Sequence, residues 1–73
     1  MNYTYKLRTD IIFDEDNKAH TVYGIDLSEN GIVKKSIKDI FFDSTSAERL
    51  VELCNSCNLS PIHLMDVIED ALP

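Results

Sequence analysis

The clearest candidates for chemistry in this 73-residue chain are Cys54 and Cys57, which form a C-x-x-C sequence. That spacing occurs in redox enzymes, where it lies at a helix N-terminus, and in zinc sites, which need four ligands. Here the pair falls near the expected end of a helix, and His20 and His63 lie far apart in sequence. We therefore interpret both thiols first as core packing, and keep metal binding and redox chemistry as alternatives.

The charge pattern argues against two classes of partner. The net charge is −6, and residues 43–73 carry most of it, with six acidic side chains and one basic side chain, Arg49. Nonspecific binding to nucleic acid needs basic side chains that neutralise phosphates, and an anionic membrane surface attracts basic segments. We expect neither partner for an acidic chain.

Composition predicts a single domain over residues 1–73. The N-terminal residues lack the basic and apolar regions of a secretory leader, and no apolar run approaches the length of a membrane span. We therefore expect a cytoplasmic protein without cofactors, whose cysteines are reduced thiols.

Three segments alternate as strands do. Residues 3–13 place apolar and aromatic side chains at odd positions, residues 21–27 alternate in the same way, and residues 32–42 form a third, less regular run. These runs predict an antiparallel meander.

The turn between the second and third runs is marked by Asn30 and Gly31. A two-residue loop would place apolar side chains opposite polar ones. A three-residue loop that begins at Glu29 pairs Leu27 with Val33 and keeps odd residues on one face. We therefore predict the longer loop, with Gly31 in the left-handed conformation that follows a type I turn.

The first helix is expected to begin near Thr45, which is spaced from Glu48 as a capping box, although Asp43 or Ser44 could also cap it. One stripe follows the helical period and should be buried: Ala47, Leu50, Val51, Cys54 and Cys57.

The second helix should start at Pro61 and run to about Leu72. Ser60 is predicted to be its N-cap, with Leu59 and Leu64 spaced as a hydrophobic staple. Its expected apolar side consists of Leu64, Val67, Ile68, Ala71 and Leu72.

These elements predict an α+β fold, in which a three-stranded antiparallel meander is followed by two short antiparallel helices packed on one sheet face (βββαα). The helices should cover the face that carries the odd-numbered residues, because it is the only large apolar surface available.

The opposite, even-numbered face is the candidate docking surface. If Phe13 pairs with Thr21, Arg8 lies opposite Asp26, and the predicted hairpin places Lys34 on the other side of Asp26. This arrangement is compatible with an ordinary solvated face or with a surface that docks an acidic partner, including a second copy. The candidate partner-binding residues are Arg8, Asp26, Lys34 and Lys38.

Three segments, Tyr23–Ile25, Ser60–Leu64 and Val67–Asp70, resemble a family of small uncharacterised proteins from low-GC Gram-positive bacteria. The likeness in layout spans nearly the whole chain. It implies a bacterial, cytoplasmic protein and supplies no activity, cofactor or site residue.

Residue patterns for a nucleophile elbow, a phosphate-binding glycine loop and paired metal motifs are absent from the sequence. The leading hypothesis is a noncatalytic protein-binding or regulatory domain, acting on a protein partner or as a homodimer. The alternative is a metal- or redox-responsive protein that uses Cys54 and Cys57.

Overall fold

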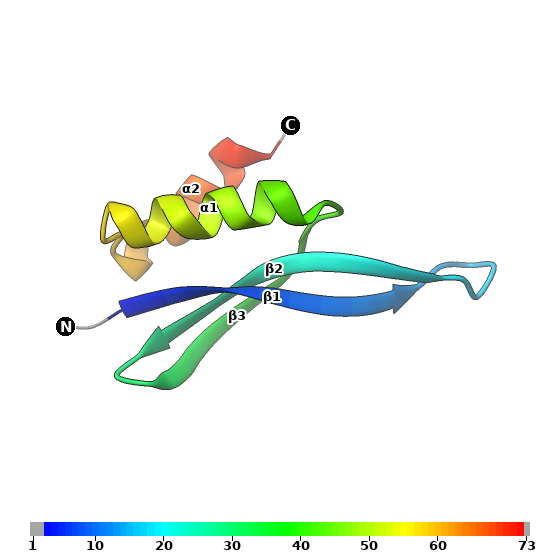
Figure 1. Cartoon of the computed structure of the whole chain (residues 1–73), viewed down its shortest axis with the longest axis horizontal. Coiled ribbons are helices and arrows are strands. Elements are labelled where there is room, and N and C mark those ends of the chain that lie inside the picture. Colours follow the sequence, from blue (N-terminus) through cyan, green and yellow to red (C-terminus); the bar gives the residue numbers. More distant parts are fainter. Residues whose placement is uncertain (1–2, 73) are drawn as a thin grey trace.

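The computed structural model describes residues 3–72; Met1 and Asn2, on which the expectation of no leader partly rests, lie outside that range. The elements, in chain order, are β1 (Tyr3–Phe13), β2 (Ala19–Glu29), β3 (Ile32–Phe41), α1 (Ser44–Ser56), the 3₁₀ turn η1 (Pro61–His63) and α2 (Leu64–Ala71). The strands form one antiparallel sheet in the order β1-β2-β3, and the helices lie over one of its faces (Figure 1). The predicted βββαα fold is confirmed.

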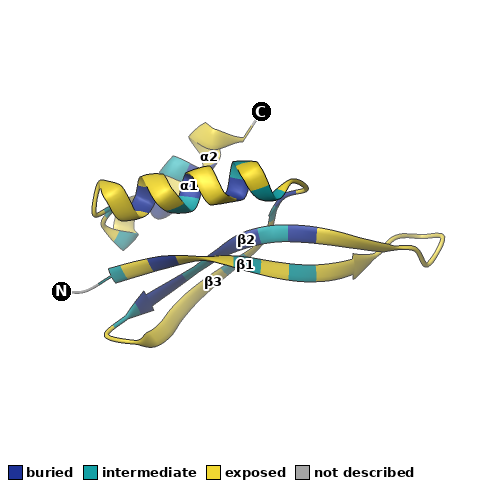
Figure 2. Ribbon diagram, viewed as in Figure 1, coloured by how far each residue is buried: buried dark blue, intermediate teal, exposed yellow. Residues whose placement is uncertain are grey.

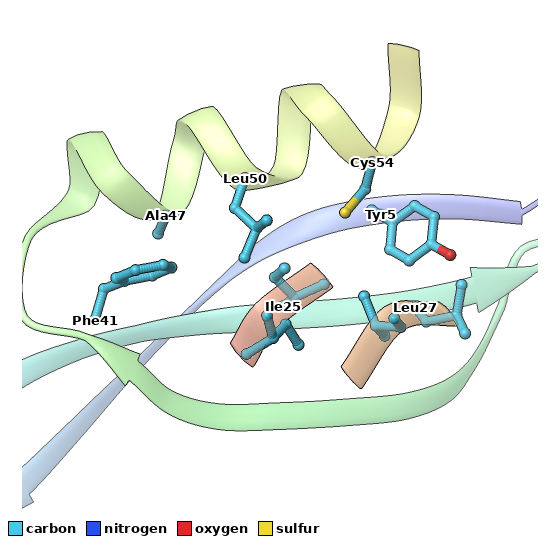
Figure 3. Close-up of a cluster of buried hydrophobic side chains, with 9 residues drawn as sticks. Tyr5, Ile25, Leu27, Phe41, Ala47, Leu50 and Cys54 are labelled. Carbon is cyan, nitrogen blue, oxygen red and sulfur yellow. The ribbon is translucent and has the colours of Figure 1, made fainter. Parts of the chain in front are cut away.

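The core lies between α1, α2 and the half of the sheet beneath them (Figure 3). Its sheet residues are all odd-numbered, as predicted for the covered face. The buried cluster consists of Tyr5, Ile25, Leu27, Phe41, Ala47, Leu50, Cys54, Leu64 and Ile68.

The helices cover only part of that face. β1 and β2 continue past α1 as a two-stranded ribbon, which is mostly exposed (Figure 2). Ile11 and Phe13 lie on this ribbon and are 64% and 65% exposed, although both have odd numbers. The expectation that the helices hide the whole odd face is therefore wrong for the second half of β1.

The register of β1 and β2 differs by two residues from the prediction. Phe13 pairs with Ala19, not Thr21, so Arg8 lies opposite Gly24. A slip of two residues leaves every side chain on its original face, and alternation in the sequence therefore cannot detect it.

The shorter loop is held by Asp14. Its backbone N–H donates to the Lys18 carbonyl at 3.0 Å, and its Oδ1 accepts from the backbone N–H groups of Asp16 and Lys18, both at 2.9 Å. Asn17 takes a left-handed conformation, with φ of 61°, as asparagine tolerates. These contacts close the turn between Asp14 and Lys18.

The β2–β3 hairpin has a two-residue loop, which corrects the predicted three-residue loop. Glu29 pairs with Ile32, and Asn30 and Gly31 have φ of 53° and 83°, the two positive values that a type I′ turn requires. The left-handed conformation of Gly31 is confirmed, in a different turn.

The first of two bulges in β3 solves the matching problem that the two-residue loop creates. The pairing passes from Ser28–Val33 to Leu27–Lys35, so Lys34 is the extra residue of the first bulge. After that bulge Leu27 faces Lys35, not Val33, and odd residues again share one face.

The second bulge lies farther along β3. Ile25 pairs with Ile37 but Tyr23 pairs with Phe41, which leaves residues 38–40 opposite Gly24, with Asp39 at φ of 57°. A Cβ on Gly24 would collide with the Ile37 carbonyl oxygen. Glycine at position 24 therefore permits the close approach of the two backbones.

Asp43 caps α1, by accepting a hydrogen bond from the Ser46 backbone N–H at 2.8 Å. This selects one of the three caps that the sequence allowed, and the helix begins at Ser44. Cys57 is the C-cap residue and is exposed, so its predicted place in the buried stripe is wrong.

The second helical segment begins with η1 and continues as α2. Ser60 is extended, but its side chain makes no capping hydrogen bond; its backbone carbonyl accepts from the His63 N–H at 3.0 Å. The predicted side-chain cap is therefore wrong. Leu64 is buried as expected, whereas Ala71 and Leu72 are exposed.

Replacing Gly24 with alanine should destabilise the domain by about 1–3 kcal/mol, because the new methyl group must displace the β3 backbone. Gly31→Ala is the comparison, since a Cβ there meets nothing within 4 Å and adds only the strain of a positive φ, about 1 kcal/mol. Chemical denaturation measures both. A Gly24→Ala change milder than Gly31→Ala would contradict the close approach at the second bulge.

Candidate functional site

The outer edge of β1 is closed at Tyr5 by a side chain from α1. The Tyr5 backbone N–H donates to Asn55 Oδ1 at 2.9 Å, and Asn55 Nδ2 donates to the Tyr5 carbonyl at 2.8 Å. The amide of Asn55 thus makes the two hydrogen bonds that a neighbouring strand would make at this position. No pattern in the sequence marked Asn55 as important.

The Tyr5 side chain makes the second contact with the helical layer. Its hydroxyl donates to the Leu59 carbonyl at 2.7 Å, and the residue is 2% exposed. Burial, followed by the nearby Cys54 and Cys57, raises the pKa of Tyr5 above its ordinary value of 10.0. The phenol therefore stays neutral and keeps its role as a donor.

Beyond Tyr5 the outer edge of β1 is open. Backbone groups alternate in direction along a strand, so Leu7, Thr9 and Ile11 turn their N–H and C=O groups outward as Tyr5 does. Asp14, of opposite parity, donates inward to Lys18, which agrees with this alternation. Within residues 3–72, no hydrogen bond reaches the outward groups of these three residues.

Arg8 and Asp26, two of the predicted docking residues, do meet on the even face. Arg8 Nη1 lies 3.3 Å from Asp26 Oδ1, and Arg8 Nε lies 2.8 Å from Asp10 Oδ2. These two carboxylates raise the pKa of Arg8 through hydrogen bonds, and the guanidinium is already paired.

The sequence analysis predicted that Arg8 and Lys34 lie opposite Asp26 on the neighbouring strands, and both of these cross-strand pairs are wrong. The residues across from Asp26 are Lys6 on β1 and Ser36 on β3, so neither Arg8 nor Lys34 lies opposite it. Lys34 and Lys38 both sit in the bulged parts of β3 and are exposed. Neither lysine forms an ion pair with any side chain in residues 3–72.

The two cysteines occupy different environments. Cys54 is buried and its side chain points into the core toward the sheet (Figure 3), while Cys57 is exposed. Burial raises the pKa of the Cys54 thiol above its ordinary value of 9.0. Both are free thiols, and the Cys57 Sγ lies 3.8 Å from the Cys54 carbonyl.

Residues 3–72 contain no cluster of metal-binding side chains and no helix that could span a membrane. In that part of the chain no three histidine, cysteine or acidic side chains are grouped so that they could hold a metal ion. Over the same residues, neither helix combines the length and apolar character needed to cross a membrane.

An apolar groove lies where the end of β3 meets α1 and α2, and the sequence did not predict it. It comprises two adjoining hollows of about 250 and 490 Å³. The first is lined by Phe41, Ser46, Arg49, Leu50, Leu53 and Ala71. The second is lined by Ile40, Phe41, Phe42, Asp43, Ser46, Ala71 and Leu72.

Comparison with known proteins identifies the family. A family of unknown function, DUF6514, matches residues 1–73, the whole sequence. The chain belongs to this family. Neither the curated proteins nor the solved structures contain a match. The resemblance seen in the sequence is thus confirmed at the level of a family of unknown function.

Asn55→Ala should destabilise the domain by about 1–3 kcal/mol, because it leaves the part-buried N–H and C=O of Tyr5 without their partner. Ser56→Ala, one residue along, is the control: its exposed hydroxyl bonds only the Leu53 carbonyl, and it should change stability by about 0.5 kcal/mol or less. Equal effects in denaturant titrations would show that Asn55 does not anchor the strand.

Alkaline pH should also destabilise the domain. Below about pH 8, Tyr5 and Cys54 are neutral in both the folded and the unfolded chain. The ordinary pKa values are 10.0 for Tyr5 and 9.0 for Cys54. As the pH rises past them, the unfolded chain releases these protons while the folded chain retains them. The free energy of unfolding therefore falls until the raised pKa values of the folded chain are passed.

Unfolding free energies measured between about pH 8 and about pH 11 test this. The decline should be shallower in Tyr5→Phe and in Cys54→Ala than in the wild type, whatever the stability of each variant at neutral pH. An unchanged slope in both variants would contradict the assignment.

Proposed function

We propose that this chain is a small noncatalytic protein-binding domain with a regulatory role in the bacterial cytoplasm, and that the apolar groove receives its partner. The observation that carries the proposal is the groove itself, which is open to solvent and floored by apolar side chains from three elements. The bacterial, low-GC Gram-positive setting rests on the sequence resemblance.

The exposed rim of the groove supports a protein partner. Phe42, Leu53 and Leu72 border the two hollows and are 76%, 52% and 41% exposed. Large apolar side chains gathered at one place on a small protein favour a contact that removes them from water. The groove thus offers sites for apolar side chains of a partner.

Arg49 defines the charge of that partner. It is the only lysine or arginine of residues 43–73, it lines the groove, and within residues 3–72 it forms no ion pair, although its charge helps to lower the pKa of Asp43, which lines the second hollow. A guanidinium beside an apolar floor pairs best with a carboxylate. We therefore expect a segment in which an apolar side chain lies next to an aspartate or glutamate.

The even face remains a second region of contact in this proposal. Arg8 is occupied by Asp10 and Asp26, so an acidic partner would meet the exposed lysines of the sheet, Lys6 opposite Asp26 and Lys34 and Lys38 in the bulges of β3. Exposed ion pairs contribute little each, and the sheet lysines would steer a partner more than they would hold it.

The experiment is a selection from a random peptide library displayed on phage, followed by titration of the ¹⁵N-labelled chain with the enriched peptides. Enriched sequences should combine apolar and acidic side chains, and the amide shifts of Ser46, Leu53 and Ala71 should change most. Peptides whose shifts map to the sheet, or no enrichment, would contradict the groove as the binding site.

Matched variants sharpen the test. Arg49→Glu and Leu53→Asp should each weaken peptide binding by about tenfold or more. Ile62→Asp is the control, because Ile62 is 80% exposed and does not line either hollow. A loss of binding in the control equal to that in the groove variants would show that the apolar surface is not specific.

A further inference from the structure

Part of the outer edge of β1 has backbone groups that are free to pair with another strand. From Leu7 to Ile11 the outward backbone groups are unpaired within residues 3–72, and Thr9 at the centre is exposed. An open edge of this kind is a template for another strand. The opposite edge of the sheet is protected, since β3 carries two bulges and the exposed Lys34, Lys35 and Lys38.

Asn55 sets the limit of any added strand. Because its amide already holds the outward N–H and C=O of Tyr5, a partner strand can pair only beyond Tyr5. The free part of the edge is therefore about as long as an average strand. A longer partner strand would have to displace Asn55.

Charge selects the register for a second copy of this chain. If two β1 strands pair antiparallel with Thr9 on the two-fold axis, Arg8 lies opposite Asp10 of the partner subunit, and Asp10 lies opposite Arg8 of the partner subunit. Within each chain Arg8 and Asp10 are already bonded at 2.8 Å, so four charges of alternating sign would lie side by side.

Neighbouring registers lose this complementarity. Moving the axis by one residue places Asp10 opposite Asp10 of the partner subunit, or Arg8 opposite Arg8 of the partner subunit, and like charges directly opposite each other destabilise a strand pair. The charges of Arg8 and Asp10 therefore favour the register centred on Thr9 over the two registers centred one residue to either side.

Apolar side chains match in the same register. Leu7, which is 36% exposed, lies opposite Ile11 of the partner subunit, which is among the most exposed apolar residues of the chain. In this register Phe13 lies at the level of the partner's Tyr5, and because Asn55 already holds the Tyr5 backbone there, the paired stretch ends before Phe13. The uncovered part of the odd face would then be shielded by the other copy.

From these observations we infer that the chain forms a homodimer through antiparallel pairing of two β1 edges centred on Thr9. The product is a six-stranded sheet in the order β3-β2-β1-β1-β2-β3, with the helices of both copies on one face. This interface is distinct from the groove proposed for a protein partner, and either can fail without the other.

Sedimentation of the wild type over a range of concentrations and of Thr9→Pro tests the interface. Thr9 turns its N–H outward, so proline there removes a donor from the dimer while the β1–β2 ladder is kept. Thr9→Pro should weaken dimerisation by about tenfold or more with the far-ultraviolet circular dichroism unchanged, and Thr9→Val should dimerise as the wild type does.

A wild type that stays at 8.3 kDa at every concentration would overturn the inference. So would a Thr9→Pro chain that keeps the wild-type dichroism and still dimerises.

Cross-linking gives a second readout that does not depend on a destabilising change. In a Cys57→Ser background, Thr9→Cys should oxidise to a covalent dimer, because residues paired at the axis lie about 5.5 Å apart between Cα atoms. Thr4→Cys is the control on the same strand, since the two copies of position 4 would lie roughly 33 Å apart. Equal rates for the two variants would contradict the Thr9 register.

Discussion

The contacts of Tyr5 are the constraint on which the rest of this small fold depends. Its hydroxyl holds the carbonyl of Leu59 in the connection between the helices, and its backbone is held by Asn55 near the end of α1. Its ring lies in the core beside Cys54 (Figure 3). One residue near the start of the sheet therefore fixes the position of the helical layer through contacts with residues 50 and 54 positions later in the chain.

Anchoring the helices at this end of β1 decides which surfaces are left exposed. The helical layer is shorter than the sheet, so β1 and β2 extend beyond it with Ile11 and Phe13 in solvent (Figures 1 and 2). At the other end of α1, the short α2 leaves Ala71 and Leu72 at the rim of the groove. The open strand edge and the groove both follow from the mismatch in length between the two layers.

The sequence predicted the order and type of the elements because alternation and helical periodicity are strong over these lengths. It did not predict register, since a shift of two residues at Phe13 changes no face, and a bulge at Lys34 can restore a parity that the loop breaks. It also missed Asn55, whose role depends on a contact fifty positions away. The predictions for Ser60 and Cys57 rested on local sequence rules, and the tertiary structure overrides those rules at both residues.

Amide hydrogen exchange, followed residue by residue at low and high protein concentration, tests the central claim most directly. The Tyr5 N–H points outward from an edge strand, yet it should be protected at every concentration, because Asn55 accepts its hydrogen bond. The outward N–H groups of Thr9 and Ile11 should exchange rapidly in dilute solution and become protected as concentration rises. Exchange at Tyr5 as fast as at Thr9 in dilute solution would contradict the account.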